Sequence, residues 1–594
     1  MPTNNIASVL DQLNLSPHVK FPMRHLLIFL SLSSLAAEPR YRAPSPRYAV
    51  RVEADVRVPM RDGIRLATDL YIPVGAGEKL PAIMIRTPYN RKVRTEAPRL
   101  FAGQGYVVAV QDVRGKFDSE GHFTVAANET DDGSDTLDWM ATQRWSTGKI
   151  GTYGCSYLGS IQIELAKLRN PHHTAMIPQA AGGAYRFDDV LEGGAINLAD
   201  NAPWFLKWGS KVEPAPNPPK VDLEKMLLTL PLIEMLRMAG APHTDFEDYL
   251  SHGPADPWWD HFGYVNDRHH FNTPALQICS WYDSVVNDAL LLAGLMRRNA
   301  ETAQSRDNQF LVVGPSTHCG FDTATEQTVV GKRELGDAQF DYYDLYLRWY
   351  DHWLRGQPNG LASVPKVQIF VMGANRWRSE NEWPLARTKF VRYFLHSNGK
   401  AHGQQGDGVL STVEPRDEPA DNFRYDPKNP VPSLGGGSQD QSAVEDRPDV
   451  LVFSTPPLKT GIEVTGPLEV TLFVGSSARD TDFTAKLVDV YPDGTAFNLQ
   501  EGILRARYRE GFNKKVWMAP GEQYQLKIDL HATSNYFPPR HRIRLEISSS
   551  NFPRFDRNLN TGGNNYDETQ PLVAENTVHH SRKLPSFITL PVVP

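Results

Sequence analysis

The fold is decided by the stretch Gly151-Thr152-Tyr153-Gly154-Cys155-Ser156-Tyr157-Leu158-Gly159. A strand-like run ends at Gly154, and residues 161–168 continue in a helical pattern. A serine on such a sharp strand-to-helix turn exposes its hydroxyl at the carboxyl edge of a sheet, where small neighbours allow close backbone packing. The start of the helix directs backbone N–H groups toward a developing oxyanion. The pattern predicts that Ser156 is a nucleophile, although the second glycine comes one place later than in the common G-x-S-x-G and a plain turn is the alternative.

Strand-like and helix-like segments alternate on both sides of this turn, which predicts an α/β fold with a doubly wound, mainly parallel sheet. A helical pattern covers 131–143, and a later helix repeats Leu345, Trp349 and Trp353 at i, i+4 and i+8. The buried-strand runs are 81–85, 106–110, 275–278 and 310–313.

Two later loops carry the partners that a serine nucleophile needs. Such a hydroxyl requires a base, and the base requires a third group to orient it. In a doubly wound sheet these groups follow in the order serine, acid, histidine, each after a later strand. Asp283 follows the run 275–278, and His318 follows 310–313. We therefore predict a catalytic triad of Ser156, Asp283 and His318.

The chain is long enough to require several domains, since it has 594 residues and single cores stop growing at about 250–300. The interval 184–272 has short helical stretches and many prolines and tryptophans, and the pattern after residue 363 changes to alternating strands typical of a β-sandwich. The predicted organisation is an N-terminal extension (1–45), a hydrolase domain in two parts (46–183 and 273–362), a helical cap (184–272) and a C-terminal β-domain (363–594).

Composition excludes several classes of protein. Hydrophobic residues make up 40% and charged residues 22%, as in ordinary globular chains. The net charge of −7 argues against a nucleic-acid binder. With only three cysteines a disulfide scaffold is excluded, and each of them, Cys155, Cys279 and Cys319, lies beside a predicted triad segment. We expect them to serve as small buried apolar residues rather than as nucleophiles or a redox switch.

A signal peptide is predicted at residues 23–37. Met23-Arg24-His25 precedes an apolar run of about 12 residues, which is too short to span a bilayer, and small residues follow it. This predicts a secreted or periplasmic protein if translation starts at Met23. The alternative is a short N-terminal helix and a cytoplasmic protein.

Several motifs follow one another along the chain in an order that resembles a known family. They are Arg61-Asp62-Gly63, Thr87-Pro88-Tyr89, Asp112-Val113-Arg114-Gly115, the Ser156 turn, Trp281-Tyr282-Asp283, Gly314-Pro315 before His318, Asp426-Pro427, Arg447-Pro448-Asp449 and Asn551-Phe552-Pro553-Arg554-Phe555-Asp556-Arg557-Asn558. By these motifs the chain resembles the cocaine-esterase and X-Pro dipeptidyl-peptidase family of α/β-hydrolases, with glutaryl-cephalosporin acylases and α-amino-acid ester hydrolases as relatives.

The resemblance implies a helical cap inserted in the hydrolase domain and a jelly-roll β-domain. It also implies an oxyanion hole formed by the phenol of Tyr89 and the backbone N–H of Tyr157. One departure concerns substrates. The α-amino-acid ester hydrolases carry acids where this chain has Val285 and Val286, so an ammonium-binding role would fall to other polar residues. The candidates are Asn287, Asp288, Asp188, Asp189 and Glu192.

These observations predict a serine hydrolase that cleaves carboxylic esters through an acyl-enzyme, with amides as a second substrate class. We expect an aromatic acyl pocket, with Trp281 near it and Trp204 or Trp208 supplied by the cap, although these side chains could equally form cap core. No cofactor or metal is expected, and the predicted partner is a small-molecule ester or amide. An amide-directed acylase or X-Pro dipeptidyl-peptidase is the alternative. A more distant one is a carbohydrate-binding protein with an inactive hydrolase domain.

Overall fold

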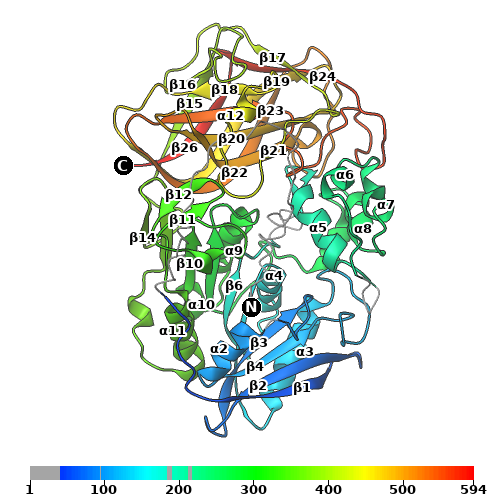
Figure 1. The fold of residues 1–594 in the computed structure, drawn as a ribbon, viewed down its shortest axis with the longest axis vertical. Coiled ribbons are helices and arrows are strands. Elements are labelled where there is room, and N and C mark those ends of the chain that lie inside the picture. Colours follow the sequence, from blue (N-terminus) through cyan, green and yellow to red (C-terminus); the bar gives the residue numbers. More distant parts are fainter. Residues whose placement is uncertain (1–40, 94, 184–189, 212–216) are drawn as a thin grey trace, which may run out of the picture. The chain divides into compact units, whose positions relative to one another are not determined.

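The computed structural model describes residues 41–93, 95–183, 190–211 and 217–594 (Figure 1). The predicted signal peptide at 23–37 lies outside the described residues. From Pro39 onward the chain forms one compact unit.

The first sheet contains ten strands in the order β1-β2-β4-β3-β5-β6-β9-β10-β13-β14. Its central pairs, from β4 to β13, are parallel, and antiparallel pairs lie at both edges. The strands are β1 (Val50–Pro59), β2 (Arg65–Pro73), β3 (Leu80–Thr87), β4 (Val107–Asp112), β5 (Ser146–Cys155), β6 (His173–Gln179), β9 (Ala275–Ser280), β10 (Gln309–Gly314), β13 (Val367–Val371) and β14 (Arg376–Glu380). This mixed sheet with helices between its strands confirms the predicted α/β class.

Helices connect these strands and cover the sheet. They are α2 (Glu96–Gly103), α3 (Glu129–Thr142), α4 (Tyr157–Ala166), α9 (Val286–Arg298), α10 (Ala303–Arg306) and α11 (Tyr342–Arg355). The predicted apolar stripe of α11 is confirmed, because Leu345, Trp349 and Trp353 are all buried against strand residues such as Phe310 and Val312. Aromatic rings at this spacing share one helix face and reach the sheet together.

The first sheet continues past the predicted boundary at residue 363. The strands β13 and β14 come after residue 363 yet belong to the first sheet, since Val312 of β10 pairs in parallel with Gln368 and β14 pairs with β13. The last strand of the first sheet therefore ends at Glu380. Alternating strand residues such as 367–371 look the same whichever sheet they join, so periodicity did not separate them from the strands that follow.

A second, twelve-stranded sheet forms the β-rich C-terminal domain, with β22 paired to the long strand β19 outside the main path. The predicted strands at 469–474 and 542–547 are confirmed as parts of β19 and β23. Its strands are β15 (Lys389–His396), β16 (Val409–Ser411), β17 (Asp421–Tyr425), β18 (Leu451–Ser454), β19 (Ile462–Ser476), β20 (Asp482–Val490), β21 (Ala496–Arg505), β22 (Tyr524–Phe537), β23 (Arg542–Ser548), β24 (Ala574–Ser581), β25 (Leu584–Pro585) and β26 (Phe587–Val593). The helix α12 (Ser442–Glu445) and the hairpin β11 (Thr328–Val330) and β12 (Arg333–Gly336) lie outside both sheets.

The segment between β6 and β9, called the insert below, carries short helices and one small hairpin. Its elements are β7 (Leu191–Glu192), β8 (Ala195–Ile196), α5 (Leu198–Trp208), α6 (Leu223–Leu227), α7 (Met235–Met238) and α8 (Phe246–Ser251), with 3-10 turns at Leu232–Glu234 and Pro257–Phe262. Its buried apolar side chains, such as Phe205, Phe246 and Trp259, share a core with Phe123 of the hydrolase domain and Phe552 of the β-rich domain.

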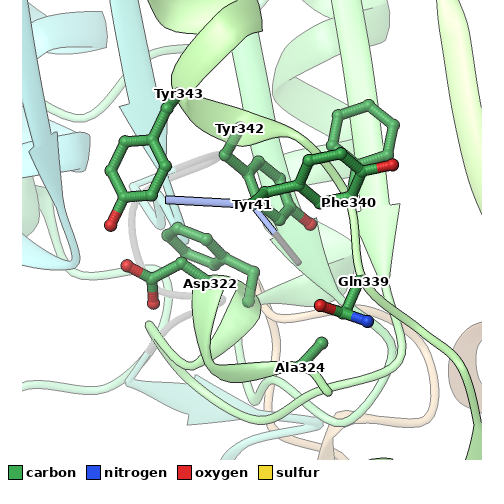
Figure 2. A pocket seen from close by; sticks show the side chains of 8 residues that line it. Tyr41, Asp322, Ala324, Gln339, Phe340, Tyr342 and Tyr343 are labelled. Atoms are coloured by element: carbon green, nitrogen blue, oxygen red, sulfur yellow. The ribbon is translucent and has the colours of Figure 1, made fainter. Parts of the chain in front are cut away.

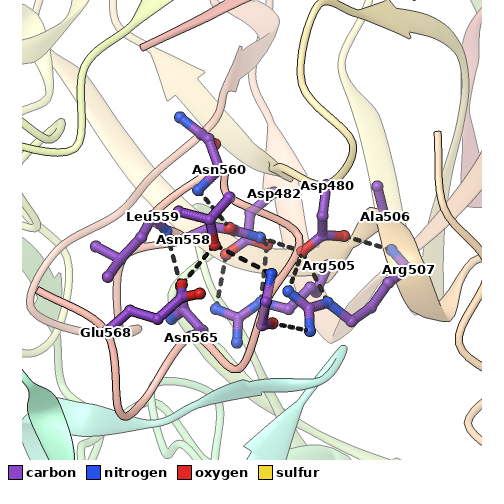
Figure 3. Close-up of polar contacts among 12 residues, drawn as sticks. Asp480, Asp482, Arg505, Ala506, Arg507, Asn558, Leu559, Asn560, Asn565 and Glu568 are labelled. Carbon is purple, nitrogen blue, oxygen red and sulfur yellow. Dashed lines mark hydrogen bonds and ion pairs between the residues drawn. The ribbon is translucent and has the colours of Figure 1, made fainter. Parts of the chain in front are cut away.

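The β-rich domain holds the insert through the loop that contains Arg554 and Asp556. The backbone N–H of Leu198 donates to the carbonyl of Arg554 at 2.8 Å, and that of Ile196 donates to the Asp556 carboxylate at 2.7 Å. Buried charges fix this loop in turn: Arg505 bridges Asp482 and Asp556 (Figure 3). The start of α5 is therefore positioned from outside the hydrolase sheet.

Candidate active site

Ser156 occupies a strained turn between β5 and α4. Its backbone has φ 64° and ψ −129°, a region that non-glycine residues adopt only where the surrounding structure holds them. The N–H of Ser156 donates to the carbonyl of Gln179 at 2.9 Å, which ties the turn to the end of β6. Such strain at a single serine is the geometry of a nucleophile turn.

The two glycines of the turn are required by close contacts. A Cβ on Gly154, whose φ is 150°, would lie 2.4 Å from the Cβ of Leu158. A Cβ on Gly159 would lie 2.3 Å from the carbonyl oxygen of Gln179. The late position of the second glycine thus has a physical reason: the first turn of α4 packs directly on the backbone of β6 at that residue.

The structure brings the three predicted triad residues together. Nε2 of His318 lies 2.8 Å from Oγ of Ser156, and Nδ1 lies 2.9 Å from Oδ1 of Asp283. The same Asp283 oxygen accepts the backbone N–H of Val285 at 3.1 Å. Asp283 is buried, whereas the side chain of His318 keeps 35% of its surface exposed. One ring nitrogen can therefore take the serine proton while the carboxylate orients the other.

Electrostatics favour the protonated form of His318. Burial lowers its pKa, but the charge and hydrogen bond of Asp283 outweigh burial, and Asp200 on α5 adds to them. The net result is a pKa above the ordinary value of 6.5. A carboxylate beside an imidazole has this effect because it stabilises the imidazolium.

Cys155 and Cys319 form a disulfide, so the expectation that all three cysteines are packing residues is wrong. Their Cα atoms are 6.0 Å apart across 164 residues of sequence. The bond joins the residue before Ser156 to the residue after His318. Only Cys279 follows the expectation, as a free, fully buried thiol whose pKa burial raises.

Both residues of the predicted oxyanion hole lie against the same side chain. Tyr89 follows β3, and its phenol oxygen accepts the indole N–H of Trp204 at 2.9 Å. Trp204 stacks on Tyr157, with ring centroids 6.2 Å apart and planes 10° from parallel. Tyr157 begins α4, where backbone N–H groups have no partner within the helix.

Buried charges that the sequence did not single out hold these two tyrosines in place. The phenol of Tyr157 donates to Glu129 at 2.7 Å, and Glu129 pairs with the buried Arg86 at 2.6 Å. On the other side Arg91, two residues after Tyr89, contacts Asp69 at 2.9 Å and forms an ion pair with Asp112. Asp112 belongs to one of the family motifs, which was the available signal for this role.

The predicted tryptophans have different environments. Trp208 packs its edge on Tyr89 with ring centroids 5.1 Å apart, so Trp204 and Trp208 both reach the oxyanion side of the site. Trp281 is instead fully buried, its indole N–H donates to the carbonyl of Phe370 at 2.8 Å, and its ring packs on Trp383. It belongs to the core rather than to a pocket beside Ser156.

The candidate ammonium-binding residues are engaged elsewhere. Glu192 pairs with His531 at 2.9 Å, Asp288 accepts the backbone N–H of Gly183 at 3.0 Å, and the amide of Asn287 donates to Asp529 at 3.1 Å. Asp188 and Asp189 lie outside the described residues. Besides Asp283, a carboxylate whose charge acts on His318 is Asp200, which the sequence did not indicate.

A small pocket of about 20 Å³ lies beyond the His318 loop and does not include the triad (Figure 2). Aromatic side chains such as Tyr41, Phe340 and Tyr343 surround the carboxyl of Asp322 there, and burial raises the pKa of that carboxyl. A space of this size holds one or two water molecules. It is too small for an ester substrate.

Two features are absent from the part of the chain that the structure describes. No group of three or more histidine, cysteine or acidic side chains there is arranged to hold a metal ion. None of the helices in these ranges combines the length and the apolar character needed to cross a bilayer.

Known proteins share this architecture. Residues 62–320 match the model of the X-Pro dipeptidyl-peptidase (S15) family, and residues 359–589 match the X-Pro dipeptidyl-peptidase C-terminal non-catalytic domain. Cocaine esterase of Rhodococcus sp. (strain MB1 Bresler) is 37% identical over 574 residues, which cover 91% of this chain and 98% of that esterase.

Solved structures agree over nearly the whole chain. An aminopeptidase from the marine sediment archaeon Thaumarchaeota archaeon has a TM-score of 0.80 at 25% identity and covers 95% of this chain and all 100% of its own. An α-amino-acid ester hydrolase has a TM-score of 0.78 at 24% identity, with the same coverage of 95% and 100%.

The motifs noted in the sequence, both family matches and the full-length similarity to an esterase therefore agree. The chain belongs to the α/β-hydrolase family that includes cocaine esterase and the X-Pro dipeptidyl-peptidases, and it is a serine hydrolase of carboxylic esters.

Proposed function

We propose that Ser156, His318 and Asp283 are the catalytic triad of this esterase. The observation that carries the proposal is the continuous chain of contacts, 2.8 Å from Oγ to Nε2 and 2.9 Å from Nδ1 to Oδ1. Nucleophile, base and orienting acid come from the ends of β5, β10 and β9, as the strand order requires.

In the first half of the reaction, Nε2 of His318 takes the Ser156 proton as Oγ attacks the ester carbonyl. The carbonyl π electrons move to the oxygen, which becomes the oxyanion. When the tetrahedral adduct collapses, the alkoxy group leaves with the proton held by His318, and an acyl-Ser156 ester remains. Water then repeats the sequence, transferring its proton to His318 and releasing the carboxylic acid. Asp283 stays ionised and stabilises the imidazolium.

The oxyanion is received by the phenol O–H of Tyr89 and the backbone N–H of Tyr157. A phenol is a strong neutral donor on a stiff side chain, and the N–H at the first turn of α4 adds the favourable end of the helix dipole. Preorganised donors of this kind contribute the largest single part of the stabilisation in many acyl-transfer sites, and the loss of one costs about 2.7–4 kcal/mol.

The insert acts as the cap of the site, and its helix α5 provides an aromatic wall for the acyl group. Support comes from Trp204 and Trp208, which recur at i and i+4 and so share one face of α5. Both contact Tyr89. Esters with flat aromatic acyl groups therefore fit best. In this proposal the β-rich C-terminal domain has the jelly-roll topology that the family resemblance implies.

A substrate panel with matched variants tests the proposal. Ser156→Ala is expected to lose essentially all turnover of an aryl benzoate, while Ser251→Ala, whose hydroxyl only bonds the carbonyl of Glu247 in its own helix, retains it. Peptide mass mapping of the wild type, quenched during turnover and then digested, should show the acyl adduct on the peptide that contains Ser156. Full activity in Ser156→Ala would overturn the triad.

Amide hydrolysis is the second candidate, favoured by the match to the X-Pro dipeptidyl-peptidase model. The same triad can acylate from an amide if the leaving amine is protonated by His318. An X-Pro anilide and a glutaryl amide assayed beside the aryl ester would rank the three activities. A carbohydrate-binding protein with an inactive hydrolase domain gains no support from the assembled triad.

We further propose that the protein is exported. The predicted signal at 23–37 supports this, and so does the Cys155–Cys319 disulfide, because disulfides persist in oxidising compartments and are rare in the cytosol. N-terminal sequencing of protein from the natural host tests the proposal. A mature chain that retains Leu26 would argue against export.

A further inference from the structure

We propose that Trp204 is a positioning residue for ester hydrolysis, which aims the Tyr89 phenol at the oxyanion through a hydrogen bond. The inference rests on the proposed role of Tyr89 as an oxyanion donor. It assigns Trp204 more than a place in the acyl pocket: a cap side chain completes the oxyanion hole of the hydrolase domain.

The direction of the hydrogen bond between Trp204 and Tyr89 determines where the phenolic hydrogen of Tyr89 points. An indole N–H is a donor only, so in the 2.9 Å contact the Tyr89 oxygen is the acceptor. The single phenolic hydrogen of Tyr89 must then point away from Trp204, toward a different acceptor. A phenol that accepts one hydrogen bond also becomes a better donor in the next, because hydrogen bonds in a chain polarise one another.

The second contact of Trp204 fixes its ring relative to the other donor. Its indole stacks nearly parallel on Tyr157, 10° between planes, and the phenol of Tyr157 is tied to the buried Glu129 at 2.7 Å. Trp204 therefore contacts both residues of the proposed oxyanion hole. Because it packs on Tyr157 at the start of α4, it fixes the Tyr89 phenol relative to that helix. Half-buried against two tyrosines, it holds a defined orientation.

Trp204 packs against both the core of the insert and the core of the hydrolase domain. Phe205 is buried and packs on Phe246 and Tyr249 of the insert. Trp204 and Trp208 lie on a different face of the helix, and both reach Tyr89.

A double-mutant cycle on the full-length enzyme tests the proposal. Trp204→Phe keeps an aromatic ring and removes the N–H, and Tyr89→Phe removes the phenol. Each single variant and the double variant are assayed with an aryl acetate, whose small acyl group makes few contacts with an aromatic wall. Trp258→Phe is the matched control, since Trp258 is another half-buried insert tryptophan, stacked on His252.

We expect Trp204→Phe to lower kcat about three- to tenfold, the range of one net hydrogen bond, with little change in KM. It should raise the inhibition constant of an arylboronic acid, whose tetrahedral adduct imitates the intermediate, by a similar factor. In the Tyr89→Phe background the same substitution should have almost no further effect, because a residue that acts through another loses its influence when that residue is gone.

The outcomes separate this inference from the proposed function. If Tyr89→Phe lowers kcat by 100-fold or more but Trp204→Phe has no effect, or its effect persists unchanged in the double variant, Trp204 does not act through Tyr89 and the inference fails alone. If Tyr89→Phe has no effect, the proposed oxyanion role fails and the inference with it. Should Trp204→Phe fold poorly, 3-benzothienylalanine at this position keeps the ring shape without the N–H and replaces it in the cycle.

Discussion

The α-carbon of Gly159 faces the carbonyl oxygen of Gln179 so closely that a Cβ there would lie 2.3 Å from it. The same Gln179 carbonyl accepts the N–H of Ser156 at 2.9 Å. The end of β6 thus sets both the strained backbone of the nucleophile and the depth at which α4 packs.

Gly159→Ala should therefore damage both stability and catalysis. Overpacking against a rigid backbone costs about 1–3 kcal/mol, and a shift of α4 would move Ser156 and the N–H of Tyr157. We expect a lower melting temperature and a lower kcat. Gly436→Ala is the control, since a Cβ at Gly436 meets nothing within 4 Å; equal effects of the two substitutions would contradict the packing argument.

The pH dependence of the enzyme should report the environment of His318. The base must be neutral to accept the serine proton, and its pKa lies above 6.5 because of Asp283 and Asp200. The value of kcat/KM should consequently fall as the pH drops through a midpoint above 6.5, and a midpoint below that value would contradict the assignment. Rate profiles of an aryl ester from pH 5 to pH 9 measure it.

The two carboxylates near His318 should have separable effects. Asp200→Asn should move the acid midpoint to lower pH while leaving the rate at high pH nearly unchanged, because Asp200 acts on His318 through charge alone. Asp283→Asn should reduce kcat by about 10³–10⁴-fold at every pH, since the orienting hydrogen bond at 2.9 Å is lost. The same rate profiles distinguish a shifted curve from a lowered one.

Reduction of the Cys155–Cys319 disulfide should weaken the protein. The bond closes a loop of 164 residues, and removing a native disulfide typically costs about 2–5 kcal/mol. Thiol titration of the unfolded chain should count one free thiol before reduction and three after it. Urea unfolding with and without a dithiol reductant measures the stability change.

The variant with both Cys155→Ala and Cys319→Ala provides the control for that experiment. It should unfold at the lower urea concentration seen for the reduced wild type, and the reductant should change it no further. A reductant effect that persists in this variant would show that the disulfide is not its cause.

Arg91 should be essential for the loop that carries Tyr89. It is fully buried and contacts Asp69 at 2.9 Å, together with Asp112. Removing one partner of a buried charge network costs about 3–5 kcal/mol, so Arg91→Met should lower the free energy of unfolding by this order and reduce kcat. The exposed pair of Arg65 and Glu120 supplies the comparison, because Arg65→Met should change stability by less than about 1 kcal/mol.

The three residues of the proposed triad could be placed together from the sequence because each follows a run of residues that the sequence pattern identifies as a strand. Ser156, Asp283 and His318 needed only the order of strands to be placed at one edge of the sheet. The glycines of the turn were visible for the same reason. Local patterns were sufficient wherever the chemistry depends on where a strand ends.

Other features depend on contacts between distant segments. No sequence pattern singled out Glu129 and Arg91, and only the packed structure shows that both are buried beside the two tyrosines. Trp281 follows a strand as the triad acid does, yet the neighbouring β-rich domain covers it. The pairing of Cys155 with Cys319 required knowing that the nucleophile turn and the histidine loop face each other at side-chain distance.

The Cys155–Cys319 bond also changes how the chain responds to proteolysis. The covalent ring that it closes contains the whole insert, α9 and the strand that leads to Asp283. A single cut in a loop of the insert would leave both fragments joined beside the active site, with the nucleophile on one piece and the base on the other. An enzyme with this topology can be cut in the insert and still keep Ser156 and His318 on one covalently connected molecule.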